Sequence, residues 1–188
     1  MAGMANGLEA LGIEVVTFDF PYMEQKRRVP DKGPVLEASF ERVFEAVASR
    51  QKPPAHHIFI GGKSMGGRIA TQLAAAKPAL PIAGLVLLGY PLHPPGKPDQ
   101  LRDRHLPSVN RPMLFIQGAR DAFGTPAELA PILARVQPPP TLHVVDGGDH
   151  SFTISRKDPA RQASVYDAIQ RTIAGWINHA GRRPARVE

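Results

Sequence analysis

The run Ile58–Gly67 constrains this chain more than any other feature, because an apolar stretch there meets a serine flanked by glycines. Residues 62–66, Gly-Lys-Ser-Met-Gly, fit the pattern Gly-x-Ser-x-Gly, in which a serine lies on a sharp turn between a strand and a helix. We expect glycines at 62 and 66 because a Cβ there would clash with the neighbouring strand and helix. This serine turn (residues 62–66) would lift the Ser64 hydroxyl to a helix N-terminus, where free N–H groups favour developing negative charge.

The same residues also resemble the end of a phosphate-binding loop, Gly-x-x-x-x-Gly-Lys-Ser/Thr. That loop requires a glycine at position 57, which is His57, and residues 58–60 are strand-like. The next apolar run, 85–88, is followed by Gly89 and not by a magnesium-binding aspartate. The phosphate-binding interpretation therefore fails at two places.

Composition and charge predict one globular domain over residues 1–179 and a basic, flexible tail over 180–188. The 188 residues are 43% hydrophobic, and they include no cysteine, no membrane-length apolar run and no signal-peptide pattern. We therefore expect a cytoplasmic protein with no membrane partner.

The net charge of +6 makes nucleic-acid binding a possible function, but no aromatic residues interleave with the basic clusters, so we expect no nucleic-acid partner. The histidines do not group at metal-ligand spacing, and we expect no metal ion or cofactor.

Hydrophobic periodicity predicts alternating strands and helices along the chain. Strands are expected at 13–18, from near 57 up to the glycines before Ser64, at 84–88, 112–117 and 141–145, and helices at 1–11, from 34, after Ser64, from 125 and from 158. Thr125 and Glu128 match a capping box, with proline at the first helical position. The alternation predicts an α/β fold with a mostly parallel sheet and helices on both faces.

Three predicted strand ends carry Ser64, Asp121 and His150, in that chain order. Because the carboxyl ends of parallel strands meet at one edge of a sheet, these side chains can converge there. A serine hydroxyl needs a base within hydrogen-bonding reach, and His150 could take its proton. Asp121 would hold the other ring nitrogen, although Asp146 or Asp149 could serve as the orienting acid instead.

Five motifs lie at these predicted turns: 18–23 (Phe-Asp-Phe-Pro-Tyr-Met), 61–68 (Gly-Gly-Lys-Ser-Met-Gly-Gly-Arg), 88–98 (Leu-Gly-Tyr-Pro-Leu-His-Pro-Pro-Gly-Lys-Pro), 117–124 (Gln-Gly-Ala-Arg-Asp-Ala-Phe-Gly) and 147–152 (Gly-Gly-Asp-His-Ser-Phe). Together they resemble a family of small bacterial α/β-hydrolases, similar to dienelactone hydrolases and to the third subunit of the non-specific-lethal chromatin complex. The resemblance covers nearly the whole chain and implies the α/β-hydrolase fold with a Ser64–Asp121–His150 triad.

The resemblance also implies two oxyanion donors, of which the Met65 N–H is one. The other belongs to a loop that follows the family's first strand, and that strand lies between the 13–18 strand and the serine strand. Both the strand and the loop are absent from this sequence, so we expect a chain shortened at its amino end, with weak or absent activity if it is complete.

The predicted function is a serine hydrolase, esterase-like, acting on a small soluble carboxylic ester or related acyl bond. The connection 90–111 is too short for a lid domain, which favours a small substrate, and Tyr90, Leu92 and Phe123 are candidate pocket walls. The alternative is a catalytically weak or inactive scaffold that binds a partner through the same surface.

Overall fold

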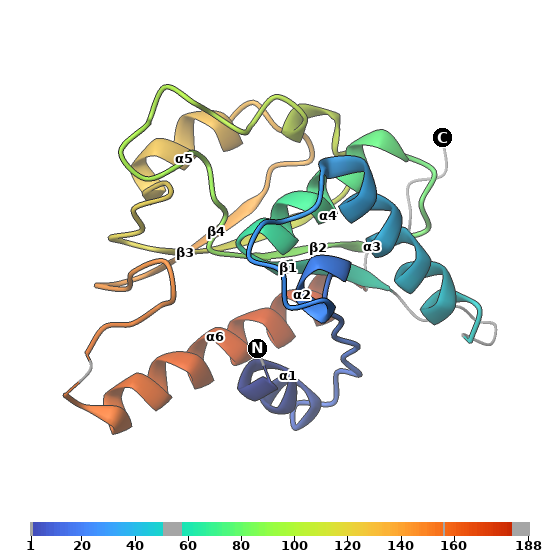
Figure 1. Cartoon of the computed structure of the whole chain (residues 1–188). Helices are drawn as coiled ribbons and strands as arrows, with labels where there is room; N and C mark the ends of the chain where they lie inside the picture. Colours follow the sequence, from blue (N-terminus) through green and yellow to red (C-terminus); the bar gives the residue numbers. More distant parts are fainter. Residues whose placement is uncertain (1, 51–57, 156, 182–188) are drawn as a thin grey trace.

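The computed structural model describes residues 2–50, 58–155 and 157–181. The predicted flexible tail over 180–188 falls almost wholly outside these ranges. Strands and helices alternate from residue 59 onward, which confirms the predicted α/β fold (Figure 1). The elements are α1 (Ala2–Glu9), α2 (Pro21–Glu24), α3 (Gly33–Ala48), β1 (Phe59–Lys63), α4 (Met65–Ala76), β2 (Gly84–Leu88), the 3₁₀ turn η1 (Leu106–Ser108), β3 (Met113–Gly118), α5 (Pro126–Leu133), β4 (Thr141–Val145) and α6 (Pro159–Ala180).

The sheet has four parallel strands in the order β1-β2-β3-β4, so the chain crosses it from one edge to the other. All six residues of β3 are buried, as expected for an inner strand covered by helices on both faces. Because every strand points the same way, the residues that follow β1, β3 and β4 all emerge at one edge of the sheet.

Helices cover both faces of the sheet and form a separate core on each (Figure 1). On one face α3, α4 and α5 pack their apolar stripes, with Phe40, Ile69 and Leu129 buried among them. On the other face α6 buries Ile169 and Ile173, and α1 packs beside α6. The predicted capping box of α5 is confirmed, because Thr125 and Glu128 exchange side-chain to backbone hydrogen bonds.

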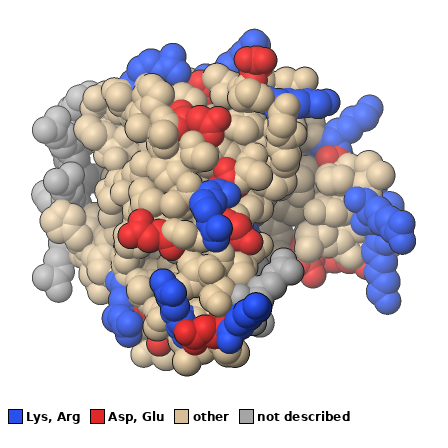
Figure 2. All heavy atoms as spheres, turned by 90° about the vertical axis from the view of Figure 1, so that its left-hand side faces the viewer, with Lys and Arg blue, Asp and Glu red and all other residues tan. Residues whose placement is uncertain are grey.

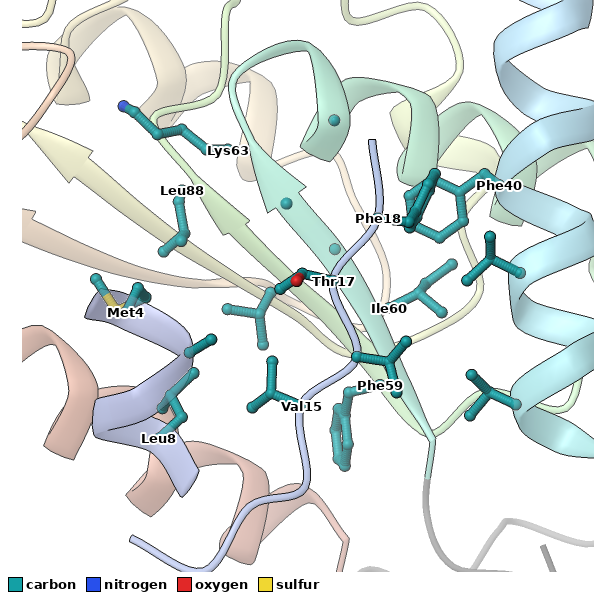
Figure 3. A pocket seen from close by; sticks show the side chains of 18 of the residues that line it. Met4, Leu8, Val15, Thr17, Phe18, Phe40, Phe59, Ile60, Lys63 and Leu88 are labelled. Atoms are coloured by element: carbon teal, nitrogen blue, oxygen red, sulfur yellow. The ribbon is translucent and has the colours of Figure 1, made fainter. Parts of the chain in front are cut away.

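Residues 13–18 are extended but form no strand, so this predicted strand is wrong. Within the described residues β1 pairs with β2 alone, and a groove of about 1320 Å³ separates its other edge from residues 13–19. Figure 3 shows the extended segment running past β1 without joining the sheet. A strand requires a neighbour about 4.8 Å away to satisfy its backbone groups, and the groove occupies that place. It lies where the family resemblance puts an additional strand.

None of the described helices is long and apolar enough to cross a membrane. On the face shown in Figure 2, Lys and Arg side chains are interspersed with Asp and Glu. This face therefore offers no continuous basic surface.

Candidate active site

Ser64 lies in strained backbone between β1 and α4. Its φ of 53° and ψ of −120° are far from the helical and extended regions that side chains prefer, a state that typically costs about 1–3 kcal/mol. Two backbone hydrogen bonds hold the turn: the Ser64 N–H donates to Leu88 O at 2.9 Å, and the Arg68 N–H donates to Ser64 O at 3.1 Å. The strain therefore presents the serine hydroxyl above the end of the sheet.

The glycines of the serine turn have different roles from those expected. Gly62 has a φ of 157° and a Cβ there would lie 3.1–3.3 Å from the backbone of Gly66 and Gly67, as predicted. A Cβ on Gly66 would meet nothing within 4 Å, so the expected clash at this position is wrong. The tight contact is at Gly67, whose Cβ would lie 2.7 Å from Gly62 O. The first turn of α4 therefore packs against β1 through residue 67.

His150 reaches Ser64 by crossing the sheet edge from β4, the strand farthest from β1. We call residues 146–150 the histidine turn. A Cβ on Gly118, at the end of β3, would lie 2.3 Å from Asp149 O. Farther along, a Cβ on Gly89, just after β2, would lie 3.0 Å from His150 O, and Gly89 has a φ of 60°. Bare glycine backbone beneath the histidine turn therefore lets it lie flat across two strands.

The three predicted side chains meet in one hydrogen-bonded chain. His150 Nε2 lies 2.9 Å from Ser64 Oγ, and His150 Nδ1 lies 2.8 Å from Asp121 Oδ2. The carboxylate can only accept, so Nδ1 carries the proton and Nε2 is free to accept the serine proton. Asp121 is 1% exposed, whereas the His150 side chain is 20% exposed, so the chain runs from the interior to the surface.

Both carboxylate oxygens of Asp121 accept hydrogen bonds, which fix the orientation of the carboxylate. Besides the histidine, the Phe123 N–H donates to Oδ1 at 2.8 Å and Gln117 Nε2 donates to Oδ2 at 2.9 Å. Gln117 is fully buried, and its Oε1 accepts from the Tyr90 N–H at 2.8 Å, which fixes its amide orientation. Sequence reasoning missed Gln117. The available signal was a lone polar side chain at the end of the apolar run 113–116.

The alternative acids do not contact the histidine ring. Asp149 Oδ1 accepts from the Ser151 and Thr153 N–H groups, at 2.8 and 2.9 Å. Burial raises the pKa of Asp149, but these hydrogen bonds outweigh it and lower the pKa overall. Asp146 is exposed. Of the three candidate acids, Asp121 is therefore the one in position to orient His150.

The candidate pocket walls divide into two groups. Tyr90 and Leu92 are both 0% exposed and belong to the core, and the Tyr90 hydroxyl donates to Arg102 O at 2.7 Å. Phe123 is half-buried beside the site, with its ring centre 4.3 Å from that of His150 and the two planes tilted by 34°. Only Phe123, of these three, lies where it could touch a molecule bound at Ser64.

The Met65 N–H lies in the first turn of α4, where a helix offers no backbone acceptor to its leading N–H groups. Its position next to Ser64 makes it a candidate donor at the site. Within the described ranges, no three His, Asp or Glu side chains gather in a way that could hold a metal ion.

Comparison with known proteins places this geometry in a family. Residues 1–178 match the family described as alpha/beta hydrolase domain.

Three similar solved structures are an alpha-beta serine hydrolase homologue from Coxiella burnetii, a monoacylglycerol lipase from Paleococcus ferrophilus and a dienelactone hydrolase from Anabaena variabilis. The first has 19% identity and a TM-score of 0.69, covering 92% of this chain and 74% of its own. The second has 16% identity and a TM-score of 0.70, covering 95% and 88%. The third has 21% identity and a TM-score of 0.63, covering 95% and 77%. At these identities the likeness to each structure is one of fold, whereas the family match spans most of the sequence. The chain belongs to the alpha/beta hydrolase domain family.

Proposed function

We propose that the protein is a serine hydrolase that cleaves a small, soluble carboxylic ester or a related acyl bond. The observation that carries this proposal is the continuous chain from Ser64 Oγ through His150 to the buried carboxylate of Asp121, with links of 2.9 and 2.8 Å. In such a chain the histidine acts as a base and the carboxylate orients it, which makes a serine hydroxyl nucleophilic near neutral pH.

In the first step, Ser64 Oγ bonds to the acyl carbon while its proton passes to His150 Nε2. The carbonyl oxygen becomes an oxyanion, and the Met65 N–H at the start of α4 donates to it. Collapse of this intermediate breaks the bond to the leaving alcohol, which takes the proton from Nε2. Water then repeats the sequence on the acyl-enzyme and releases the acid. Asp121 stays ionised throughout and stabilises the imidazolium.

Support for a small substrate comes from the connection between β2 and β3. Residues 89–112 contain one short 3₁₀ turn, and Leu106 and Val109 are buried in the core rather than forming a separate layer above Ser64. No lid domain is therefore built from this connection, and Phe123 is the proposed contact for the substrate.

A fluorophosphonate probe, which phosphorylates an activated serine, tests the proposal together with a panel of p-nitrophenyl esters of increasing chain length. We expect labelling and hydrolysis that disappear in Ser64→Ala. The matched control is Ser151→Ala, which removes an exposed hydroxyl next to His150 and should leave both unchanged. A folded protein that neither labels nor hydrolyses any ester would contradict the proposal.

The groove between β1 and residues 13–19 favours a second candidate function, a weakly active or inactive scaffold that binds a partner. It is lined mainly by apolar side chains and reaches Ser64 and Met65 at one end. Absence of labelling in a folded protein would favour this candidate over the hydrolase.

A further inference from the structure

The Lys63 side chain joins the serine turn to the histidine turn. Its Nζ donates to His150 O at 2.6 Å and lies 5.1 Å from the centre of the Phe152 ring. Figure 3 shows the side chain extending away from residues 13–18, across the carboxyl end of the sheet. Lys63 directly precedes Ser64. Two consecutive residues therefore supply the serine hydroxyl and a hydrogen bond to the backbone carbonyl of His150.

We propose that Lys63 is a positioning residue, which holds His150 at hydrogen-bonding distance from Ser64. This inference rests on the proposed function, because it concerns the geometry of that same site. Lys63 does not touch the ring nitrogens in any described contact. It acts through the main-chain carbonyl of His150.

The need for such a contact follows from the path of the histidine turn. His150 lies five residues beyond the end of β4, yet it must reach the serine beside β1 at the opposite edge of the sheet. Hydrogen bonds from Asp149 N to Thr153 O and from Phe152 N to Asp149 O join the turn to the residues that follow it but do not fix it on the sheet. Fixing it requires bonds to other strands.

Two residues supply those bonds, each next in sequence to one of the other two side chains of the site. Arg120 precedes Asp121; its backbone N–H donates to Gly148 O at 2.9 Å and its Nε donates to Gly147 O at 3.0 Å, which ties the start of the turn to the end of β3. Lys63 precedes Ser64 and ties the end of the turn to β1. The histidine turn is thus fastened at both ends.

The ammonium is well suited to this position. Lys63 is half-buried, and burial lowers its pKa, while the carboxylates of Asp121 and Asp149 oppose that shift. Phe152 is 2% exposed with a φ of 62°, and its ring face stabilises a nearby cation. A neutral side chain of the same length would fill the space without bonding the carbonyl.

The test uses Lys63→Met and Lys63→Cys. The chain contains no cysteine, so a new thiol at 63 can be alkylated alone, in the unfolded protein before refolding. Reaction with 2-bromoethylamine restores an ammonium at nearly the lysine length, and 1-bromopropane gives a neutral control of the same length that carries no hydrogen-bond donor. We expect Lys63→Met to lower kcat roughly 10- to 100-fold with little change in KM, as for a small displacement of a catalytic group. The ammonium adduct should recover most of kcat, and the propyl adduct should not.

A second readout does not require turnover. The proton between His150 Nδ1 and Asp121 should give a strongly downfield proton NMR signal, and this signal should weaken in Lys63→Met and return with the ammonium adduct. If the wild-type protein hydrolyses no ester but this signal follows the charge at 63, the proposed function fails and the positioning role stands. Wild-type kcat and an unchanged signal in Lys63→Met would overturn the inference, as would equal recovery by the two adducts. A variant that raises KM alone would assign Lys63 to substrate binding instead.

Discussion

Replacing Asp121 with asparagine should separate the charge of this residue from its role in fixing the histidine tautomer. The carboxylate accepts from His150 Nδ1, Gln117 Nε2 and the Phe123 N–H. Asparagine offers one acceptor oxygen in place of two. With that oxygen at the Oδ2 position, it still accepts from His150 and Gln117, and its NH₂ group faces the Phe123 N–H. With the oxygen at the Oδ1 position, the NH₂ group faces two donors.

The first orientation should dominate because Gln117 cannot turn its own amide over. Its Oε1 accepts from the Tyr90 N–H, and its Nε2 also donates to Gly124 O at 2.7 Å. The histidine therefore keeps its proton on Nδ1 in Asp121→Asn, and the loss is electrostatic. Unit charges about 4 Å apart interact by about 4 kcal/mol at an effective dielectric constant of 20, and the retained hydrogen bond offsets part of this. We expect kcat to fall by about 10²- to 10³-fold.

The assay is steady-state hydrolysis of p-nitrophenyl acetate with circular dichroism to confirm folding, and the matched control is Asp149→Asn. Asp149 accepts two backbone N–H groups through one oxygen, and asparagine can preserve both bonds. This control should retain wild-type kcat. A loss below tenfold in Asp121→Asn would refute the role of the carboxylate. A loss near 10⁴-fold would indicate the wrong tautomer and would refute the orienting role of Gln117.

Three further results are expected. Gly67→Ala should destabilise the protein by about 1–3 kcal/mol in urea unfolding, because its Cβ would lie 2.7 Å from a backbone oxygen, whereas Gly66→Ala should stabilise it by about 0.5–1 kcal/mol. Burial, with Arg68 nearby, lowers the pKa of His105 to about 4 from 6.5, so the unfolded chain binds more protons between these values. The free energy of unfolding should therefore rise from pH 4 to pH 6.5, and His105→Gln should reduce that slope; equal slopes would contradict this. In hydrogen exchange, the amides of residues 14–18, which donate to no backbone carbonyl in the described structure, should exchange far faster than those of β3.

The sequence was most informative where the physical constraint is local. Chain order and strand ends were enough to bring Ser64, Asp121 and His150 to one edge of the sheet, because parallel strands point their carboxyl ends the same way. The start of α5 could also be predicted from local sequence, since Thr125 and Glu128 lie three residues apart in one capping box. These predictions depend on residues close in sequence or on the direction of whole strands.

Contacts between segments that are distant in sequence could not be predicted in the same way. Gln117 and Lys63 act through partners more than 20 residues away, namely Tyr90 and His150, and neither residue type indicates a partner in advance. Tyr90 and Leu92 are candidate pocket walls from the sequence, yet both are fully buried in the structure. An apolar side chain beside a site fits the core and a pocket wall equally well. Only packing separates the two.

Residues 13–18 show the same limit for a whole segment. Val15, Val16 and Thr17 favour extended backbone, and the segment is extended, but pairing needs a neighbouring strand that local sequence cannot specify. The segment is held instead by its end, where Phe18 packs edge-to-face on Phe20 and Phe40 at 5.3 and 5.1 Å. β1 consequently depends on β2 and α4 for its position. The position of the serine turn therefore also depends on β2 and α4. Two hydrogen bonds, from the Ser64 N–H to Leu88 O and from Lys63 Nζ to His150 O, keep Ser64 and His150 aligned.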